Sequence, residues 1–311
     1  MTDEFLSERF RPSGQEILEK ENLSDLYVYY DGFFLKGKEA RVIPFDPGWL
    51  NSFGIFEGIR AYDGNIFKLD QHINRLFDSA TGIGLKVPLT KDELKEAIIL
   101  TARKNNLKNC HIRPVVTRGP GKLGMDPRRG VRASILILAY PFAPLHGEKP
   151  VRAMISSVRR KSPLSVDGKL KSLAYIDFIV ALVQAAAMGM DDAILLDQDG
   201  YVGEGCGANI AIIKNDKLVT PPPTAALQGI TIETLLEICP KLGIRATYEQ
   251  ITPLQLYTAD EAFLCGTGAE IAPIAEIDGR KIGTRTPGPV TEKLRDRYFK
   301  VVRSEDLTSI Y

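Results

Sequence analysis

The chain has few of the residues that build metal sites or disulfide frameworks. Its 311 residues include four cysteines and three histidines. Cys110, Cys206, Cys239 and Cys265 lie far apart and form no Cys-x-x-Cys pair. Such scattered residues predict neither a structural zinc site nor a set of disulfides. We therefore expect no metal and a reducing, cytoplasmic compartment.

Long apolar runs and an excess of one charge are also missing. The longest apolar stretches, 134–140 and 176–183, are much shorter than the roughly 20 residues that cross a bilayer. Residues 1–11 lack the apolar segment of a secretory signal. Lys plus Arg is 40 and Asp plus Glu is 39, a net charge of +1. This balance argues against a nucleic-acid or membrane partner and favours an enzyme with a small-molecule ligand.

The first half of the sequence alternates short strand patterns with amphipathic helix patterns. Asp31-Gly32 and Asp63-Gly64 interrupt aromatic runs and predict hairpin turns. Apolar spacing predicts a helix over 70–82, and Thr90 with Glu93 resembles the capping box of a second helix. Strands are expected at 115–116 and 134–140, so this half is α+β in character.

The second half continues the same mixture. Strands are expected at 151–156, 193–196, 209–213 and 261–265, a hairpin at 275–282, and helices at 174–188, 231–242 and 290–302. Residues 141–150 hold three prolines and a glycine, which is typical of a linker. We therefore divide the chain into an N-terminal extension (1–25), a smaller α/β domain (26–140), a linker (141–150) and a larger α/β domain (151–311).

Two lysines and one glutamate are candidates for chemistry. Lys169 and Lys171 precede a long apolar helix, where loss of solvation makes an amine nucleophilic, although a solvated surface lysine fits the same pattern. Spacing alone does not choose between them. Glu204 opens a run of small residues before an apolar strand, where a flat ligand could approach the backbone. The alternative is a loop carboxylate in solvent.

Other segments could bind anions. Residues 228–231 lead into an expected helix, and residues 266–268 follow an expected strand. Either segment could bind a phosphate through its backbone N–H groups. The alternatives are an ordinary helix N-cap for the first and an ordinary turn for the second. Arg75 could supply a matching cation, or be a solvated helix charge. His111 and Arg113 lie two residues apart on an expected strand, so their side chains share one face. Such a pair could bind a carboxylate-bearing substrate. The alternative is an exposed strand face whose charges are paired with acidic neighbours.

Taken together, these segments resemble the class IV, or fold type IV, pyridoxal-phosphate enzymes. The resemblance covers about residues 26–302. It is carried by six motifs in order: Phe56-Glu-Gly-Ile-Arg-Ala-Tyr62, His72-Ile-Asn-Arg-Leu76, Lys171-Ser-Leu-Ala-Tyr175, Glu204-Gly-Cys-Gly-Ala-Asn-Ile210, Leu227-Gln-Gly-Ile-Thr231 and Gly266-Thr-Gly-Ala-Glu-Ile271. It implies two domains with pyridoxal 5′-phosphate between them and a homodimer or higher homo-oligomer.

The resemblance also implies roles for individual residues. Lys171 matches the lysine of the internal aldimine, Glu204 the carboxylate on the pyridine nitrogen, and Tyr175 the tyrosine on the phenolic oxygen. Phosphate contacts are implied for Arg75, Ile230, Thr231 and Thr267. Substrate contacts are implied for Phe56, Arg60, His111, Arg113, Gly268 and Ala269.

The implied reaction is amino-group transfer from an amino acid to a 2-oxo acid such as 2-oxoglutarate, and the chain resembles branched-chain-amino-acid aminotransferases. Asn51, His111 and Leu145 stand where those enzymes carry pocket tyrosines, and Ile232 replaces an arginine. These departures leave three other activities open: a D-amino-acid or (R)-amine transaminase, an aminodeoxychorismate lyase-like enzyme, and a non-catalytic module that binds a phosphate ligand.

Overall fold

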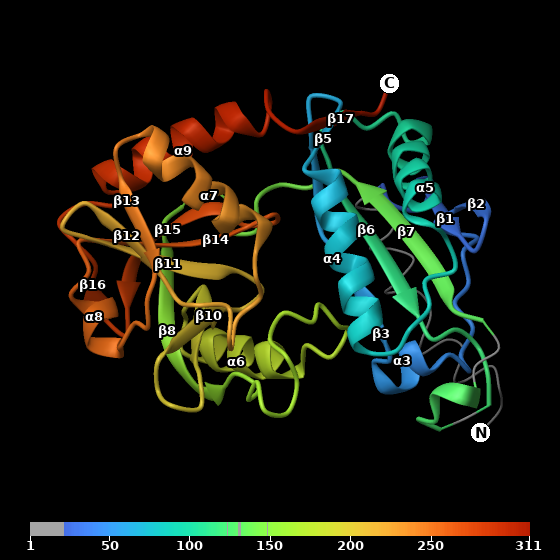
Figure 1. The fold of residues 1–311 in the computed structure, drawn as a ribbon, viewed down its shortest axis with the longest axis horizontal. Helices are drawn as coiled ribbons and strands as arrows, with labels where there is room; N and C mark the ends of the chain where they lie inside the picture. The colour runs from blue at the N-terminus through green and yellow to red at the C-terminus, as the bar shows by residue number, and fades with distance from the viewer. Residues whose placement is uncertain (1–21, 123, 130–131, 148) are drawn as a thin grey trace.

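Two β-sheets lie side by side in the molecule, and helices pack against both (Figure 1). The computed structural model describes residues 22–122, 124–129, 132–147 and 149–311. Residues 1–21 of the predicted N-terminal extension lie outside the described residues. The arrangement of two mixed sheets with helices confirms the predicted α/β (α+β) fold class.

The first sheet is built mainly from the N-terminal half. In the described part of the chain it has eight strands, in the order β17-β5-β4-β6-β7-β1-β2 with β3 beside β6. Its strands are β1 (Tyr27–Tyr30), β2 (Phe33–Lys36), β3 (Gly54–Phe56), β4 (Ile59–Tyr62), β5 (Asn65–Phe67), β6 (Cys110–Thr117), β7 (Ser134–Tyr140) and β17 (Leu307–Ser309). The helical segments are α3 (Pro47–Asn51), α4 (Leu69–Gly82), α5 (Lys91–Lys104) and the short 3₁₀ turn Pro127–Arg129.

Local sequence signals explain the turns and helix starts of this half. Asp31 and Gly32 both have positive φ, 48° and 100°, as the tight hairpin between β1 and β2 requires. Thr90 accepts a hydrogen bond from the Glu93 backbone N–H, and the Glu93 carboxylate accepts one from the Thr90 N–H. The predicted hairpin and capping box are therefore confirmed.

The alternation of side chains along β6 gives the first sheet two different faces. Ile112 and Val116 are fully buried in the core formed with α4 and α5. His111 and Arg113 point the other way and line a cavity between the two sheets. The period of two along a strand thus places polar groups on the face turned toward the second sheet.

The second sheet has nine strands among the described residues, in the order β10-β9-β8-β15-β14-β11-β12-β13, with β16 beside β15. Its strands are β8 (Val151–Arg159), β9 (Asp192–Leu196), β10 (Val202–Gly205), β11 (Asn209–Lys214), β12 (Lys217–Thr220), β13 (Arg245–Tyr248), β14 (Glu261–Gly266), β15 (Glu270–Ile277) and β16 (Arg280–Lys281). Its helices are α6 (Ile176–Ala187), α7 (Ile230–Lys241), α8 (Pro253–Tyr257) and α9 (Pro289–Val301).

The C-terminal segment connects the two halves. After α9 the chain crosses back to the first sheet, where β17 pairs antiparallel with β5 (Figure 1). Residues 307–309 therefore join the first sheet, although the sequence-based division assigns them to the larger domain. The described residues of the predicted linker, 141–147 and 149–150, form neither helix nor strand. The domain boundaries themselves stay a prediction.

The described residues carry neither a membrane-spanning helix nor a cluster of metal ligands. No helix among them is long and apolar enough to cross a membrane. They also contain no group of three or more His, Cys, Asp or Glu side chains suited to a metal ion.

Candidate active site

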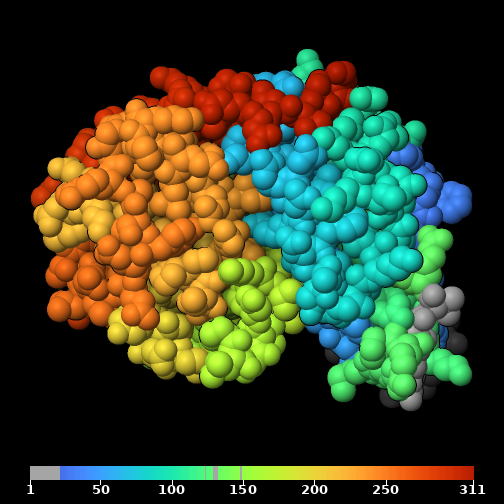
Figure 2. Space-filling model, viewed as in Figure 1, coloured from blue at the N-terminus to red at the C-terminus, as the bar shows by residue number. Residues whose placement is uncertain are grey.

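A cavity of about 330 Å³ lies where the two halves meet, and both contribute to its lining. Figure 2 shows the halves packed against each other along their length. The cavity size is within the range of about 300–1,000 Å³ that small-molecule sites occupy. Eleven of the residues that the sequence singles out line it: Phe56, Arg75, His111, Arg113, Lys171, Tyr175, Glu204, Ile230, Thr231, Thr267 and Gly268.

Lys171 reaches this cavity from a loop that is fixed to β3. The Lys171 carbonyl accepts a hydrogen bond from the Phe56 N–H at 3.1 Å, and the Leu173 N–H donates to the Gly54 carbonyl at 2.9 Å. The Lys171 amine lies 3.2 Å from the Tyr175 hydroxyl and 4.6 Å from the centre of the Phe56 ring. Lys169 is exposed and does not line the cavity, so the geometry favours Lys171.

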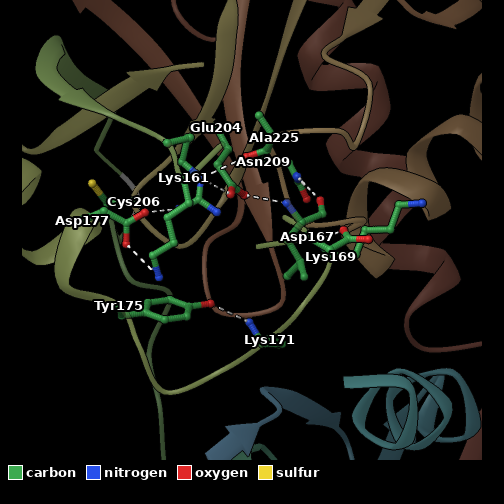
Figure 3. A network of polar contacts seen from close by, with 12 residues as sticks. Lys161, Asp167, Lys169, Lys171, Tyr175, Asp177, Glu204, Cys206, Asn209 and Ala225 are labelled. Atoms are coloured by element: carbon green, nitrogen blue, oxygen red, sulfur yellow. Dashed lines mark hydrogen bonds and ion pairs between the residues drawn. The ribbon is translucent and has the colours of Figure 1, made fainter. Parts of the chain in front are cut away.

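Glu204 lies on β10 and is almost completely buried. Its Oε2 accepts a hydrogen bond from the Leu227 N–H at 3.2 Å. Its Oε1 lies 3.0 Å from the Arg160 Nε, but that N–H donates to the Ala225 carbonyl, so Oε1 has no hydrogen-bond donor. Burial raises the pKa of Glu204 to about 7, and the positive charge of Arg160 opposes this rise. Figure 3 shows the surrounding polar network.

Arg75 points into the cavity from α4 and is held by a buried carboxylate. Glu57 accepts two hydrogen bonds from its guanidinium, at 2.6 and 2.9 Å, and a further N–H donates to the Gln228 carbonyl at 2.8 Å. Glu57 also contacts His72 Nδ1 at 2.8 Å. Burial alone would raise the pKa of Glu57, but Arg75 and His72 outweigh it and hold that pKa well below its usual value.

The start of α7 lies beside Arg75 and brings backbone N–H groups to the cavity. Gly229 is its N-cap, and Ile230 and Thr231 form its first turn. A Cβ on Gly229 would lie 1.8 Å from the Asn209 Oδ1, so only glycine fits. The N-terminus of a helix favours a negatively charged group. Together with Arg75 and the nearby Thr267, this end of the cavity is suited to a phosphate.

Strand β6 contributes His111 and Arg113 to the cavity. His111 is 4% exposed, and neither of its ring nitrogens has a hydrogen-bond partner. Burial lowers its pKa to about 3, with a further contribution from Arg113, so the ring is neutral near pH 7. The Arg113 guanidinium lies 4.8 Å from the centre of the Phe56 ring. The side chains that line the cavity near these two polar groups are aromatic or aliphatic, and include Phe56, Phe142 and Leu145.

The remaining predicted residues lie outside the cavity lining. Arg60 is absent from the lining: it donates to the Phe142 carbonyl at 3.2 Å and lies 3.6 Å from Glu270. Ala269 is buried and is absent from the lining, whereas the adjacent Gly268 is part of it. The sequence alone does not reveal these differences, because they depend on how neighbouring loops pack.

The positions that depart from the branched-chain pattern differ in their relation to the cavity. Leu145 lines it, and its N–H donates to the Gly268 carbonyl at 3.0 Å. Asn51 is exposed on α3 and does not line the cavity, and Ile232 is buried in the core of α7. Of these replacements, those at 111 and 145 therefore bear directly on this cavity.

Sequence reasoning did not assign a role to several buried charged groups near the cavity. Glu57 and His72 support Arg75, and Arg160 and Asp177 lie beside Glu204. Glu57 and His72 lie within the motifs 56–62 and 72–76, so their position in a motif is the sequence feature that could have pointed to them. Nothing in the local pattern around Arg160 distinguishes it from the neighbouring Arg159.

The polar groups of the cavity lining fit the predicted cofactor. Glu204 Oε1 is buried with an unused acceptor position, as a protonated ring nitrogen requires. The glycine at 229 lets the start of α7 pack directly against the Asn209 side chain, at the edge of the cavity. An amine, a carboxylate and a phosphate cradle therefore converge on one cavity of suitable size.

Comparisons with known proteins agree with this geometry. Residues 54–277 match the family model described as amino-transferase class IV. The chain belongs to the class IV aminotransferase family. Class membership confirms the resemblance read from the sequence, the enzyme class and the cofactor, pyridoxal 5′-phosphate.

The relatives of this class IV aminotransferase are similar over nearly their whole length. A Methanocaldococcus jannaschii protein with a provisional branched-chain-amino-acid aminotransferase name is 45% identical, covering 91% of this chain and 99% of the relative. The branched-chain-amino-acid aminotransferase of Pseudomonas aeruginosa is 39% identical, covering 89% and 93%. The crystal structure of the Thermoproteus uzoniensis branched-chain aminotransferase with norvaline is 40% identical, with a TM-score of 0.87, covering 92% and 99%.

Proposed function

We propose that this aminotransferase moves the amino group of a branched-chain L-amino acid, or a donor like it, to a 2-oxo acid such as 2-oxoglutarate. The names of its relatives support this donor over the D-amino-acid, (R)-amine and lyase activities. The cavity supports it as well, because Phe56, Phe142 and Leu145 offer apolar surface to an aliphatic side chain.

Lys171 carries the central role in this proposal. Pyridoxal 5′-phosphate, when bound, supplies an electrophilic carbonyl carbon and a ring that accepts electrons. The Lys171 amine would hold the cofactor through its carbonyl carbon, and once displaced by the substrate amine it would accept the proton from the substrate Cα and deliver it to that cofactor carbon. Its distance of 3.2 Å from the Tyr175 hydroxyl keeps the amine oriented.

The charged groups of the cavity divide the binding of the cofactor among them. Glu204 accepts a hydrogen bond from the protonated ring nitrogen, because its Oε1 has no other donor. Tyr175 donates its hydroxyl hydrogen bond to the phenolic oxygen. The phosphate would be held by Arg75, by the backbone N–H groups of Ile230 and Thr231, and by Thr267. It would therefore lie between the positive end of a helix dipole and a guanidinium group.

The wall formed by the first sheet receives the substrate. Arg113 provides the positive charge for a carboxylate, and the neutral His111 ring offers one N–H donor and one acceptor. Phe56 and Gly268 shape the space between them. Arg60 and Ala269 were assigned substrate contacts from the resemblance, and their positions outside the lining favour a supporting role.

The observation that carries this function is the convergence of Lys171, Glu204 and Arg75 on one cavity. The holoenzyme should form a borohydride-trapped adduct of the cofactor at Lys171, detected by peptide mass spectrometry. Separate samples of untreated holoenzyme should be mixed with L-leucine, L-glutamate, D-alanine and (R)-1-phenylethylamine, and conversion to pyridoxamine phosphate followed by absorbance. Conversion with L-leucine and L-glutamate is expected, whereas conversion with D-alanine alone would replace the proposed donor.

We further propose that the enzyme is a homodimer or higher homo-oligomer in the cytoplasm. Support for the oligomer comes from an apolar stripe on α6, where Ile176, Ile179 and Val183 are 63%, 54% and 64% exposed. Contiguous exposed apolar surface of this kind marks protein contacts. The four free cysteines support a reducing compartment. Light scattering coupled to gel filtration tests the oligomer, since a monomeric mass at micromolar concentration contradicts it.

A further inference from the structure

Arg160 occupies a distinctive position directly after β8, next to the Glu204 carboxylate. Its side chain is 8% exposed. The Nε atom lies 3.0 Å from Glu204 Oε1 and donates its hydrogen bond to the Ala225 carbonyl at 3.0 Å. The Nη1 atom donates to the Asp177 carboxylate. The guanidinium is thus oriented by two protein acceptors while its charge lies against Glu204.

The backbone and the aliphatic side-chain atoms of Arg160 are held in place, as its guanidinium is. Its N–H donates to the Leu196 carbonyl at 2.9 Å, and its carbonyl accepts from the Gln198 side chain at 2.6 Å. A Cβ on Gly203 would lie 3.1 Å from the Arg160 Cγ, so the residue preceding Glu204 is packed against the arginine stem. Arg160 directly follows β8 and Glu204 lies on β10, and both strands pair with β9, which lies between them.

The two effects on Glu204 oppose each other. Burial favours the neutral acid, and the adjacent Arg160 charge favours the carboxylate. Asp177 is bonded to Arg160, and Lys161 Nζ lies 3.8 Å from Asp177, so the network alternates in sign: Glu204, Arg160, Asp177, Lys161. Figure 3 shows Lys161, Asp177 and Glu204 together at this side of the site. Lys171 adds a second positive charge near Glu204.

We propose that Arg160 is a positioning residue that favours the ionised form of Glu204 against burial and presents its Oε1 to the cofactor ring nitrogen. This inference rests on the proposed function, because it assigns Glu204 to that nitrogen. Arg160 acts through Glu204: its own N–H groups at Nε and Nη1 are occupied by Ala225 and Asp177. Without Arg160, burial would protonate the carboxyl group, and the ring nitrogen would lose its anionic partner.

The test uses holoenzyme loaded with pyridoxal 5′-phosphate labelled with ¹⁵N in the ring, because the ¹⁵N chemical shift reports whether that nitrogen is protonated. Arg160→Met removes the charge at similar side-chain length. Glu204→Gln provides the reference spectrum of a ring without its carboxylate. Arg160→Lys keeps the charge and is the matched control. Arg160→Gln takes the place of the methionine variant if the latter fails to fold.

The wild type and Arg160→Lys should show a protonated ring nitrogen at neutral pH, and Arg160→Met should shift to the value of Glu204→Gln. The kcat of Arg160→Met should fall on the order of 10²-fold, with the amino-acid KM changed by less than about threefold. The double variant Arg160→Met/Glu204→Gln should lose little beyond either single variant, because both remove one interaction.

The inference is overturned if the neutral variant at 160 keeps the wild-type ¹⁵N shift while Glu204→Gln loses it, because Arg160 would then act only on folding. Failure of the proposed function looks different. In that case the wild type itself forms no borohydride-trapped adduct at Lys171. A wild type that forms the adduct, with a ring nitrogen insensitive to residue 160, contradicts this inference alone.

Discussion

The two walls of the cavity use polar groups in contrasting ways. On the cofactor wall, we group Arg75, Glu204 and Lys171 with their supports, and each charge has a charged or polar neighbour within about hydrogen-bond distance. On the substrate wall, His111 has two unpartnered ring nitrogens and Arg113 has an unpartnered Nε. Glu204 Oε1 and, behind it, Asp177 Oδ1 are also buried without a hydrogen-bond partner, and the first of these is the acceptor proposed for the cofactor ring nitrogen. The cofactor wall thus leaves one acceptor open toward a permanent ligand, while the substrate wall leaves several polar atoms for ligands that change during turnover.

Buried unpartnered atoms are unusual enough to be informative. A buried polar group without a partner destabilises a protein by about 1–3 kcal/mol. Tolerating several of them on one wall fits a site whose substrate completes the hydrogen bonds. The comparison therefore predicts that changes on the cofactor wall alter cofactor binding and catalysis together, whereas changes on the substrate wall alter selectivity.

The largest effect is expected from Lys171→Ala on the cofactor wall. The variant loses the amine that bonds the cofactor and moves the substrate proton, so kcat should fall by about 10⁴-fold or more. Steady-state transamination with L-leucine and 2-oxoglutarate measures this. Lys169→Ala is the matched control and should keep near wild-type activity, since Lys169 is exposed outside the cavity. Equal losses in the two variants would contradict the choice of Lys171.

The next effect is expected from Glu57→Gln, which removes the negative charge behind Arg75. The buried guanidinium then lacks its ionic partner, and breaking such a pair destabilises proteins by about 3–5 kcal/mol. The cofactor dissociation constant should rise by about 10²-fold because Arg75 is no longer held at the phosphate end.

Two measurements separate positioning from simple unfolding in that variant. Thermal melting of the apoprotein gives the stability loss, and fluorescence titration of the folded variant gives cofactor affinity. Glu57→Asp keeps the charge and should recover part of both. Unchanged cofactor affinity in folded Glu57→Gln would show that Arg75 does not depend on Glu57.

A smaller effect is expected from pH on the apoenzyme. Glu204 has its pKa raised to about 7, chiefly by burial. Below that pH the carboxyl group is protonated and lacks the charge that pairs with a ring cation. Cofactor affinity should therefore rise by about tenfold between about pH 6 and about pH 8. The Glu204→Gln variant controls for titration of the cofactor itself, and an identical pH dependence in both proteins would contradict the role of Glu204.

The smallest effect is expected on the substrate wall. His111→Phe keeps an aromatic ring but removes both nitrogens, so one hydrogen bond to the substrate is lost, worth about 1 kcal/mol. The KM of one substrate should rise by about fivefold while cofactor affinity and the Lys171 adduct stay unchanged. Because burial holds the pKa of His111 near 3, this difference should be the same from about pH 6 to about pH 8. A loss of cofactor affinity in His111→Phe would contradict the claim that residues of the substrate wall act on substrate binding and not on cofactor binding.

Much of the local structure could be read from the sequence because short-range signals specify it. The Asp31-Gly32 turn, the Thr90 capping box and the apolar spacing of α4 are each contained within a few neighbouring residues. Four short strands are missing from the sequence-based prediction: β10, β12, β13 and β17 carry too few residues for a periodic pattern. β17 in particular is fixed by pairing with β5, more than two hundred residues earlier.

The sequence by itself determined the cofactor class, the α/β architecture and the segments that meet at the site, because each motif is local and their order is preserved. The family resemblance already selected Lys171 over Lys169, and the cavity supports that choice because Lys171 lines it and Lys169 does not. Only the tertiary structure set Arg60 outside the cavity lining and brought Glu57 to Arg75 and Arg160 to Glu204. The physical reason is that burial and charge pairing are properties of neighbours in space. Arg160 and Glu204 are 44 residues apart in the sequence, and only packed strands bring their charges within 3.0 Å.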